Sequence, residues 1–143
     1  MISTPIKDTI LRAVDDSSNE IVSFLQQLIR IDSETGREGR VQEFIGSTLR
    51  DMGLQVDSWV VDTRELEGHP AFIPIDGMNF EGRPNVVGIL KGEPDARSLL
   101  LNGHVDTITS EPLSEWIDSP FSGALRDGRI YGRGASDMKG GLA

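Results

Sequence analysis

The sequence predicts a layered α/β domain, and three observations support that prediction. Apolar residues recur at helical spacing through roughly the first fifty positions. Segments rich in Val, Trp and Leu follow, with the composition of β-strands. One of them, residues 98–103, is apolar on both faces, which is typical of a strand in the middle of a sheet. Helices followed by such strands indicate helical layers packed on a mainly covered, mixed sheet.

Three helical patterns open the chain. A weak one covers residues 6–16, and a firmer one follows Asn19, whose side chain has the chemistry of an N-cap. A loop at 32–36 separates it from a helix that begins at about Glu38 and ends with Gly53 in the C′ position. The apolar stripes are core surfaces to which we assign no function. They consist of Ile21, Phe24, Leu25, Leu28, Ile29, Val41, Phe44, Ile45 and Leu49.

Four segments have the composition of strands. Residues 54–62 and 85–90 are the first two, and the stretch between them is rich in proline and glycine and forms a long connection or an irregular hairpin. Residues 98–103 form the expected central strand. A short fourth strand is expected at 129–131, after a turn.

The composition excludes several classes of protein. The net charge of −9 would repel a nucleic-acid backbone, and no run of Lys or Arg compensates for it. The chain has no cysteine, so disulfides and thiolate metal sites are excluded and any metal must bind to His, Asp or Glu. The N-terminus does not have the pattern of a signal peptide, and no apolar stretch is long enough to span a membrane. We therefore expect a soluble, cytoplasmic protein.

His104 and Asp106 follow the predicted central strand. Side chains two positions apart on an extended segment point the same way, so these two should share one side at the strand's carboxyl end, where α/β sheets place ligands. Asp106 would accept a hydrogen bond from one ring nitrogen of His104 and leave the other for a metal. The pattern is weak by itself, because a histidine at a strand end is more often an ordinary hydrogen-bonded residue. The other histidine, His69, is expected to be a solvated loop residue.

A glycine-rich loop near the end of the chain surrounds a single carboxylate, that of Asp137. Four glycines within the ten positions 132–141 permit tight or left-handed backbone geometry, which would allow the loop to aim Asp137 into a site. The loop does not match a dinucleotide-binding or phosphate-binding motif, because the third glycine and the Ser or Thr that these motifs need are absent.

The two segments together suggest a zinc site. A neutral imidazole, its carboxylate partner and a second carboxylate suit a borderline cation such as Zn²⁺. Catalytic zinc usually has three protein ligands and a water, whereas this chain offers two convincing ones, His104 and Asp137.

At these residues the sequence resembles the M20 family of metallopeptidases, in the branch of acetylornithine deacetylase, succinyl-diaminopimelate desuccinylase and aminoacylases. The resemblance covers most of the chain. Its most specific part is the long glycine-rich run at its characteristic distance after Gly-His-x-Asp. The matching motifs are GRPNVV (82–87), LNGHVD (101–106), Trp116 with SPF (119–121), and residues 128–143, which include YGRGASDMKGG (131–141).

The resemblance implies a site and a reaction. His104 would bind one zinc ion, Asp137 would bridge two, with Co²⁺ as a substitute metal, and Asp106 would act as a catalytic-site residue that orients and polarises His104. The peptide bond after Asp137 is typically cis in that family. A zinc-bound water, activated by a glutamate, would cleave a linear amide bond and so deacylate an N-acyl amino acid or a dipeptide.

The same resemblance implies that residues 1–143 are the N-terminal portion of a layered αβα, zinc-peptidase-like catalytic domain. The general-base glutamate, the remaining ligands and the lid or dimerisation domain follow later in the family, so we expect a fragment that is inactive by itself. A homodimeric parent and the exact substrate stay open. The competing interpretation is a short, non-catalytic binding protein that reuses half of the fold.

Overall fold

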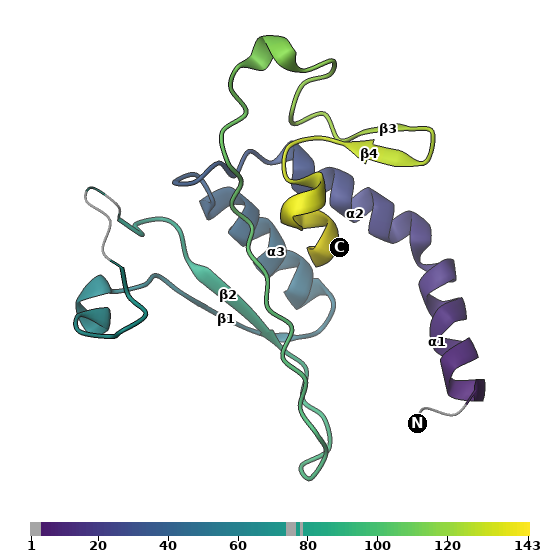
Figure 1. Ribbon diagram of the computed structural model, residues 1–143. Coiled ribbons are helices and arrows are strands. Elements are labelled where there is room, and N and C mark those ends of the chain that lie inside the picture. Colours follow the sequence, from purple (N-terminus) through teal and green to yellow (C-terminus); the bar gives the residue numbers. More distant parts are fainter. Residues whose placement is uncertain (1–3, 74–76, 78) are drawn as a thin grey trace. The chain divides into compact units, whose positions relative to one another are not determined.

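The computed structural model describes residues 4–73, 77 and 79–143, and they form two compact units. One unit combines residues 1–30 with 111–143, and the other comprises residues 31–110. Three helices open the described chain, and four short strands with helical turns follow them (Figure 1), so the fold class is α/β, as the sequence predicts. No helix in these ranges is both long and apolar enough to cross a bilayer.

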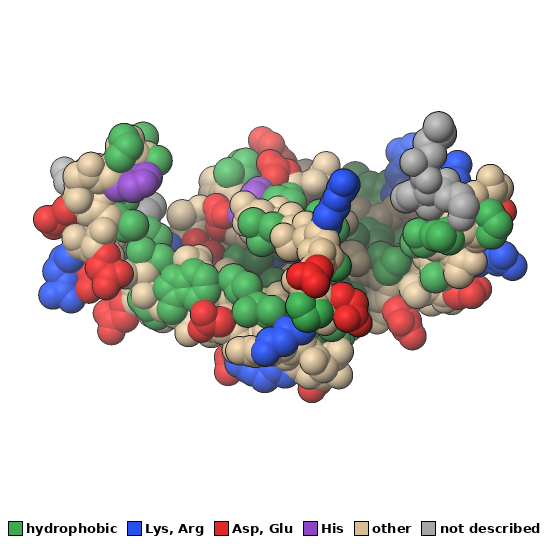
Figure 2. All heavy atoms as spheres, turned by 90° about the horizontal axis from the view of Figure 1, so that it is seen from below, with side chains coloured by type: hydrophobic (Ala, Val, Ile, Leu, Met, Phe, Trp, Pro, Cys, Tyr) green, Lys and Arg blue, Asp and Glu red, His purple; other side chains and the backbone are tan. Residues whose placement is uncertain are grey.

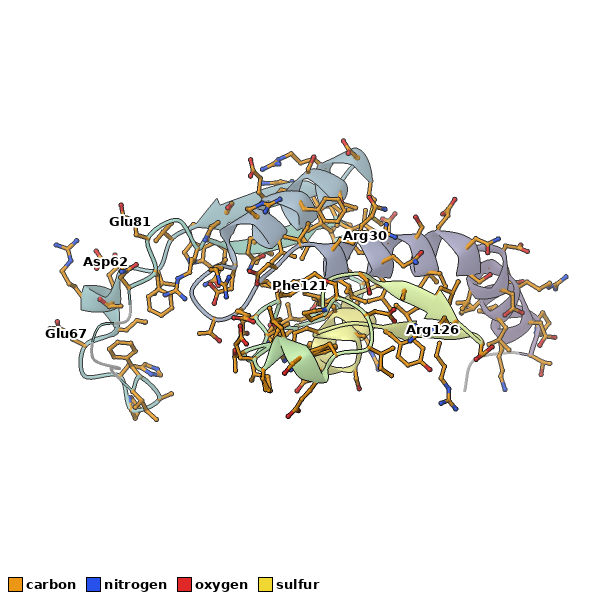
Figure 3. All side chains as sticks on the ribbon, turned by 90° about the horizontal axis from the view of Figure 1, so that it is seen from above. Arg30, Asp62, Glu67, Glu81, Phe121 and Arg126 are labelled. Atoms are coloured by element: carbon orange, nitrogen blue, oxygen red, sulfur yellow. The ribbon has the colours of Figure 1, made fainter. Side chains whose placement is uncertain are left out.

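The unit of residues 31–110 is built on a helix packed against a two-stranded sheet. Strands β1 (Gln55–Trp59) and β2 (Asn85–Ile89) pair antiparallel, and α3 (Gly39–Asp51) lies against both. The packing is close at Gly88, where an added Cβ would lie 3.1 Å from a methyl carbon of Leu49 on the helix. The bare backbone of β2 therefore lets α3 approach the sheet. The connection between the strands contains a short helical turn, η1 (Thr63–Leu66), with Asp62, Glu67 and Glu81 around it (Figure 3).

The end of α3 matches the predicted glycine cap. Gly53 has φ +83° and donates its N–H to Arg50 O, while the N–H of Leu54 donates to Leu49 O. This pair of bonds is the Schellman arrangement, in which a left-handed C′ residue satisfies the last carbonyls of the helix. Glycine adopts that conformation without a steric penalty, which is why the sequence alone locates the end of this helix.

The unit of residues 1–30 and 111–143 contains α1 (Thr4–Asp16), α2 (Ser18–Arg30) and a β-hairpin of β3 (Ala124–Arg126) and β4 (Arg129–Tyr131). The hairpin turn at Asp127 and Gly128 has positive φ at both residues, the conformation that matches the twist of paired strands. The unit also holds a short turn η2 (Leu113–Glu115), a wide helical turn η3 (Ala135–Lys139) and the final α4 (Gly140–Leu142) (Figure 1).

Two expectations about these elements are wrong. Asn19 lies inside α2 and does not cap it, because the helix begins at Ser18 and Ile21 already donates its N–H to Ser17 O. Residues 98–103 do not form the expected central strand: no described segment pairs with them, and Leu99, Leu100 and Leu101 are 82–84% exposed. An apolar run has strand propensity, but it becomes a covered strand only where other strands and helices are present to cover it.

Candidate metal-binding and active-site residues

The segment after residue 103 is extended and has two distinct sides. Val105 and Thr107 are buried, whereas His104 and Ile108 are exposed and Asp106 is partly exposed. This alternation is the period of two that an extended chain imposes. It places the side chains of His104 and Asp106 on the same side, as the sequence predicts.

His104 and Asp106 form a close pair. His104 Nδ1 lies 3.2 Å from Asp106 Oδ1 and 3.2 Å from the backbone oxygen of Asp106. Both neighbouring oxygens accept hydrogen bonds, so in the neutral ring the hydrogen belongs on Nδ1 and Nε2 carries the lone pair. The predicted pairing of imidazole and carboxylate is therefore present, and it fixes which nitrogen would bind a metal.

The loop between α2 and α3 holds this segment in place. The N–H of Thr107 donates to Ser33 O at 2.9 Å, and the N–H of Thr35 donates to Thr107 O at 3.1 Å, forming a short parallel bridge. The hydroxyl of the fully buried Ser33 donates to Val105 O at 2.7 Å. These bonds attach the backbone around His104 to a chain segment about seventy residues away.

Glu34, in the same loop, adds an electrostatic contact. Its carboxylate accepts the N–H of Ser110 at 2.6 Å and pairs with Arg37. The nearby hydroxyl of Ser110 and its donating amide, together with the nearby Arg37 charge, hold the pKa of Glu34 below its ordinary value of 4.5. The roles of Ser33, Glu34 and Thr35 could not be predicted from the sequence, because a loop containing two short hydroxyl residues is their only local signal.

Asp137 lies within η3, in the other unit. Asp137 and Met138 have non-helical backbone angles (φ −129°, ψ 101° and φ −128°, ψ 25°), and the peptide bond between them is cis, as the family resemblance implies. Gly132 precedes this turn in a tight space, where an added Cβ would lie 2.4 Å from Ile29 Cγ2 on α2. The glycine-rich loop can therefore pack directly on the helix. The glycine pattern predicts tight backbone geometry in this loop, but it does not predict that Ile29 is the neighbour.

Lys139 fixes the other end of this turn. It is fully buried, and its Nζ donates to Leu28 O at 2.9 Å, close to the C-terminus of α2. A cation there satisfies one of the last helix carbonyls and interacts favourably with the negative end of the helix dipole. Asp137 thus projects from a turn that is attached to α2 two residues further on.

The segment before the hairpin also contacts the glycine-rich loop. The N–H of Arg133 donates to Pro120 O at 2.7 Å, and its guanidinium lies 4.9 Å from the centre of the Trp116 ring. Next to this segment, Arg30 at the end of α2 donates its Nε–H to Ser122 O at 3.3 Å (Arg30 and Phe121 are labelled in Figure 3). Trp116 and Pro120, which carry part of the family resemblance, therefore help to hold the loop of Asp137.

The predicted ligands are divided between the two units. His104 and Asp106 belong to the unit of residues 31–110, and Asp137 belongs to the other, so their meeting at one metal stays a prediction. In the described ranges, no three or more His, Cys, Asp or Glu side chains gather into a group that would hold a metal ion. His69 is an exposed loop residue whose Nδ1 accepts the N–H of Ala71, in line with its expected role.

Charged side chains of both signs lie on the molecular surface. On the face seen in Figure 2, acidic and basic side chains are interspersed with hydrophobic ones.

Comparison with known proteins connects this chain to one enzyme family. Residues 100–143, which include His104, Asp106 and Asp137, match the model of peptidase family M20/M25/M40. The chain is 33% identical over 141 residues to N-formyl-4-amino-5-aminomethyl-2-methylpyrimidine deformylase of Bacillus subtilis, covering 94% of this chain and 29% of that protein. It is 34% identical over 120 residues to succinyl-diaminopimelate desuccinylase of Polynucleobacter necessarius, covering 82% of this chain and 27% of the relative.

Two solved structures share the fold. Human carnosine dipeptidase 1 superposes with a TM-score of 0.72 at 24% identity, covering 94% of this chain and 28% of that one. An M20 family metallo-carboxypeptidase from Sulfolobus solfataricus gives a TM-score of 0.62 at 26% identity, covering 86% and 24% of the two chains. The chain spans less than a third of the length of these relatives. From the matched motif segment, the curated relatives and the shared fold, we conclude that this chain belongs to peptidase family M20/M25/M40.

Proposed function

We propose that this chain supplies part of the active site of a zinc-dependent hydrolase that removes an acyl group from the nitrogen of a small amino compound. The observation that carries the proposal is the pairing of His104 Nδ1 with the Asp106 carboxylate at 3.2 Å, inside the segment that matches the family model. Metal-bound histidines usually donate their second ring N–H to such a carboxylate.

The donor set fits a zinc ion. His104 would offer Nε2, the nitrogen that carries the lone pair when Nδ1 holds the hydrogen, and Asp137 would offer carboxylate oxygens. Zinc, when bound, supplies Lewis acidity and lowers the pKa of a coordinated water; Co²⁺ is the expected substitute.

Asp106 has a separate task in this proposal. Its carboxylate keeps the proton on Nδ1 and thereby holds the ring in the tautomer whose Nε2 carries the lone pair. Asp106 is therefore a positioning residue for His104 in the chemistry we propose.

The proposed substrate follows from what the relatives have in common. Their names describe a deformylase, a desuccinylase, a dipeptidase and a carboxypeptidase, and each of these activities cleaves a C–N amide bond next to a carbonyl group. We propose a linear amide of a small N-acyl amino compound as the substrate class, with an N-acyl amino acid or a dipeptide as its typical member.

The isolated 143-residue chain should not catalyse the reaction. Catalytic zinc usually has three protein ligands, and we propose only His104 and Asp137 from this chain, without a general base. We expect it to bind Zn²⁺ weakly and to hydrolyse neither N-formyl nor N-succinyl amino compounds above the rate without protein.

Zinc titration calorimetry on the purified chain tests the proposal. Replacing His104 or Asp137 with Ala should each remove the binding, whereas His69→Ala, a change at the exposed second histidine, should leave it intact. Zinc binding that survives both ligand replacements would contradict the proposed chemistry. A chain that binds no zinc under any condition would favour a non-catalytic binding protein.

A further inference from the structure

Thr35 contacts the carboxylate that orients His104. Its hydroxyl donates to Asp106 Oδ2 at 3.3 Å, while His104 Nδ1 lies 3.2 Å from Asp106 Oδ1. Each oxygen of the carboxylate therefore has its own donor, one from the neighbouring histidine and one from a loop 71 residues away in the sequence.

The backbone of Thr35 is fixed relative to Asp106. Thr35 donates its N–H to Thr107 O at 3.1 Å, and the N–H of Thr107 donates to Ser33 O at 2.9 Å. These bonds form the parallel bridge between Glu34 and Thr107, the residues next to Thr35 and Asp106 in the sequence. The hydroxyl thus reaches the carboxylate from a backbone already held in register with it, so little additional ordering is needed to form the bond.

Packing encloses neither side chain completely, because the side chains of His104 and Asp106 are 48% and 44% exposed. A carboxylate held at one oxygen turns readily about its terminal torsion, whereas one held at both oxygens has a preferred orientation.

We propose that Thr35 is a positioning residue, whose hydroxyl holds Asp106 in the orientation that keeps the hydrogen of His104 on Nδ1. The inference deepens the proposed function, since the tautomer it sets is the one that presents Nε2 to a metal. It also stands apart from that function, because the tautomer is measurable without any metal.

The sequence provides a matched set of variants. Thr35→Val removes the hydroxyl and keeps the shape, and Thr35→Ser restores a hydroxyl. Thr107→Val is the control at the other end of the same bridge, because the buried Thr107 Oγ1 has no hydrogen-bond partner among the described residues. His69 and His104 are the only two histidines in the chain, so their ring signals are readily assigned in nitrogen-15 NMR spectra.

The experiment measures the ring tautomer of His104 by nitrogen-15 NMR and zinc affinity by calorimetry in the full 143-residue chain. Thr35→Val should shift the ratio of the two tautomers away from Nδ1–H and weaken zinc binding, each by about threefold to tenfold. Thr35→Ser and Thr107→Val should match the unchanged protein in both measurements. Amide spectra establish that each variant is folded.

The outcomes separate this inference from the proposed function. An unchanged tautomer ratio in folded Thr35→Val, or an equal shift in Thr107→Val, would overturn the positioning role. A ratio that shifts in Thr35→Val and recovers in Thr35→Ser supports the role even if no variant binds zinc, in which case the metal function alone fails.

Discussion

The ammonium nitrogen of Lys139 lies 2.9 Å from the carbonyl oxygen of Leu28, and the whole Lys139 side chain is buried. This bond attaches the loop of Asp137 to the end of α2. Lysines are rarely buried so completely unless they have a partner, so the contact identifies a structural requirement of the loop. The loop that carries Asp137 therefore depends on Lys139 for its attachment to α2.

Replacing Lys139 with Met should destabilise the unit of residues 1–30 and 111–143 by about 1–3 kcal/mol. Methionine fills a similar volume but leaves the Leu28 carbonyl without its charged donor. Urea unfolding followed by tryptophan fluorescence measures the effect. In a Trp59→Phe background, Trp116 is the only tryptophan and reports on this unit. Lys7→Met, on the exposed side of α1, is the control; equal stabilities of the two Met variants would refute the anchoring role.

Gly132→Ala should be more damaging than an ordinary loop substitution. An added Cβ would lie 2.4 Å from Ile29 Cγ2 and 3.0 Å from Pro120 O, so the loop would have to move away from α2. Overpacking of this kind costs about 1–3 kcal/mol, measurable by the same unfolding assay. The matched control is Gly92→Ala in the other unit, followed at Trp59 in a Trp116→Phe background; no atom lies within 4 Å of the added Cβ there, and stability should be nearly unchanged. Equal effects at the two positions would contradict the close packing.

Glu34 should make the unit of residues 31–110 less stable in acid. Its pKa is held below 4.5 in the folded protein, chiefly by the nearby Ser110 hydroxyl and by the Ser110 amide that donates to its carboxylate. Its contribution is therefore fully present above about pH 4.5 and is lost as the pH falls through the lower, folded-state pKa. Glu34→Gln should reduce stability by about 1–2 kcal/mol at neutral pH.

The effect of acid on Glu34 is measured as the difference in unfolding free energy between the original protein and Glu34→Gln. Unfolding is followed at Trp59 in a Trp116→Phe background, so that the signal comes from the unit that contains Glu34. The gap between the original protein and Glu34→Gln should narrow as the pH drops below 4.5. Asp62, whose pKa Arg64 lowers to about 2, contributes with the same sign to both proteins and cancels in the comparison. A gap that stays constant with pH would exclude this role of Glu34.

Removing the charge of Asp106 should weaken zinc binding without unfolding the chain. Asp106→Asn replaces the carboxylate beside His104 Nδ1 with an amide, and loss of such an outer partner typically costs about 10- to 100-fold in metal affinity. Calorimetry measures the change, with Asp118→Asn as the control, because Asp118 pairs with Arg126 in the other unit. Identical affinities of the two Asn variants would mean that Asp106 does not support a metal ligand.

Features determined by local chain geometry could be predicted from the sequence. Gly53 marks the end of α3 because a left-handed C′ residue favours glycine wherever the helix lies. The pairing of His104 with Asp106 follows from the period of two in an extended chain, which holds even though residues 98–103 form no strand.

Features that depend on distant partners could not be predicted in the same way. The apolar run at 98–103 resembles a buried strand, but burial depends on which segments cover it. The burial of Lys139 has no local signal in the sequence, because its acceptor, Leu28 O, is 111 residues away. The hydrogen bond from Thr35 to Asp106 could not be predicted for the same reason, since no periodicity of the sequence connects residues 71 positions apart.

The central claim is that His104 and Asp137 bind the same metal ion, and a double-mutant cycle in zinc affinity tests it most directly. The four proteins are the original chain, His104→Ala, Asp137→Ala and the double variant, each titrated with Zn²⁺ under identical conditions. Ligands of one ion act as a unit, so we predict that either single change removes nearly all of the binding and that the second change adds nothing. Independent effects that add in the double variant would contradict the shared site.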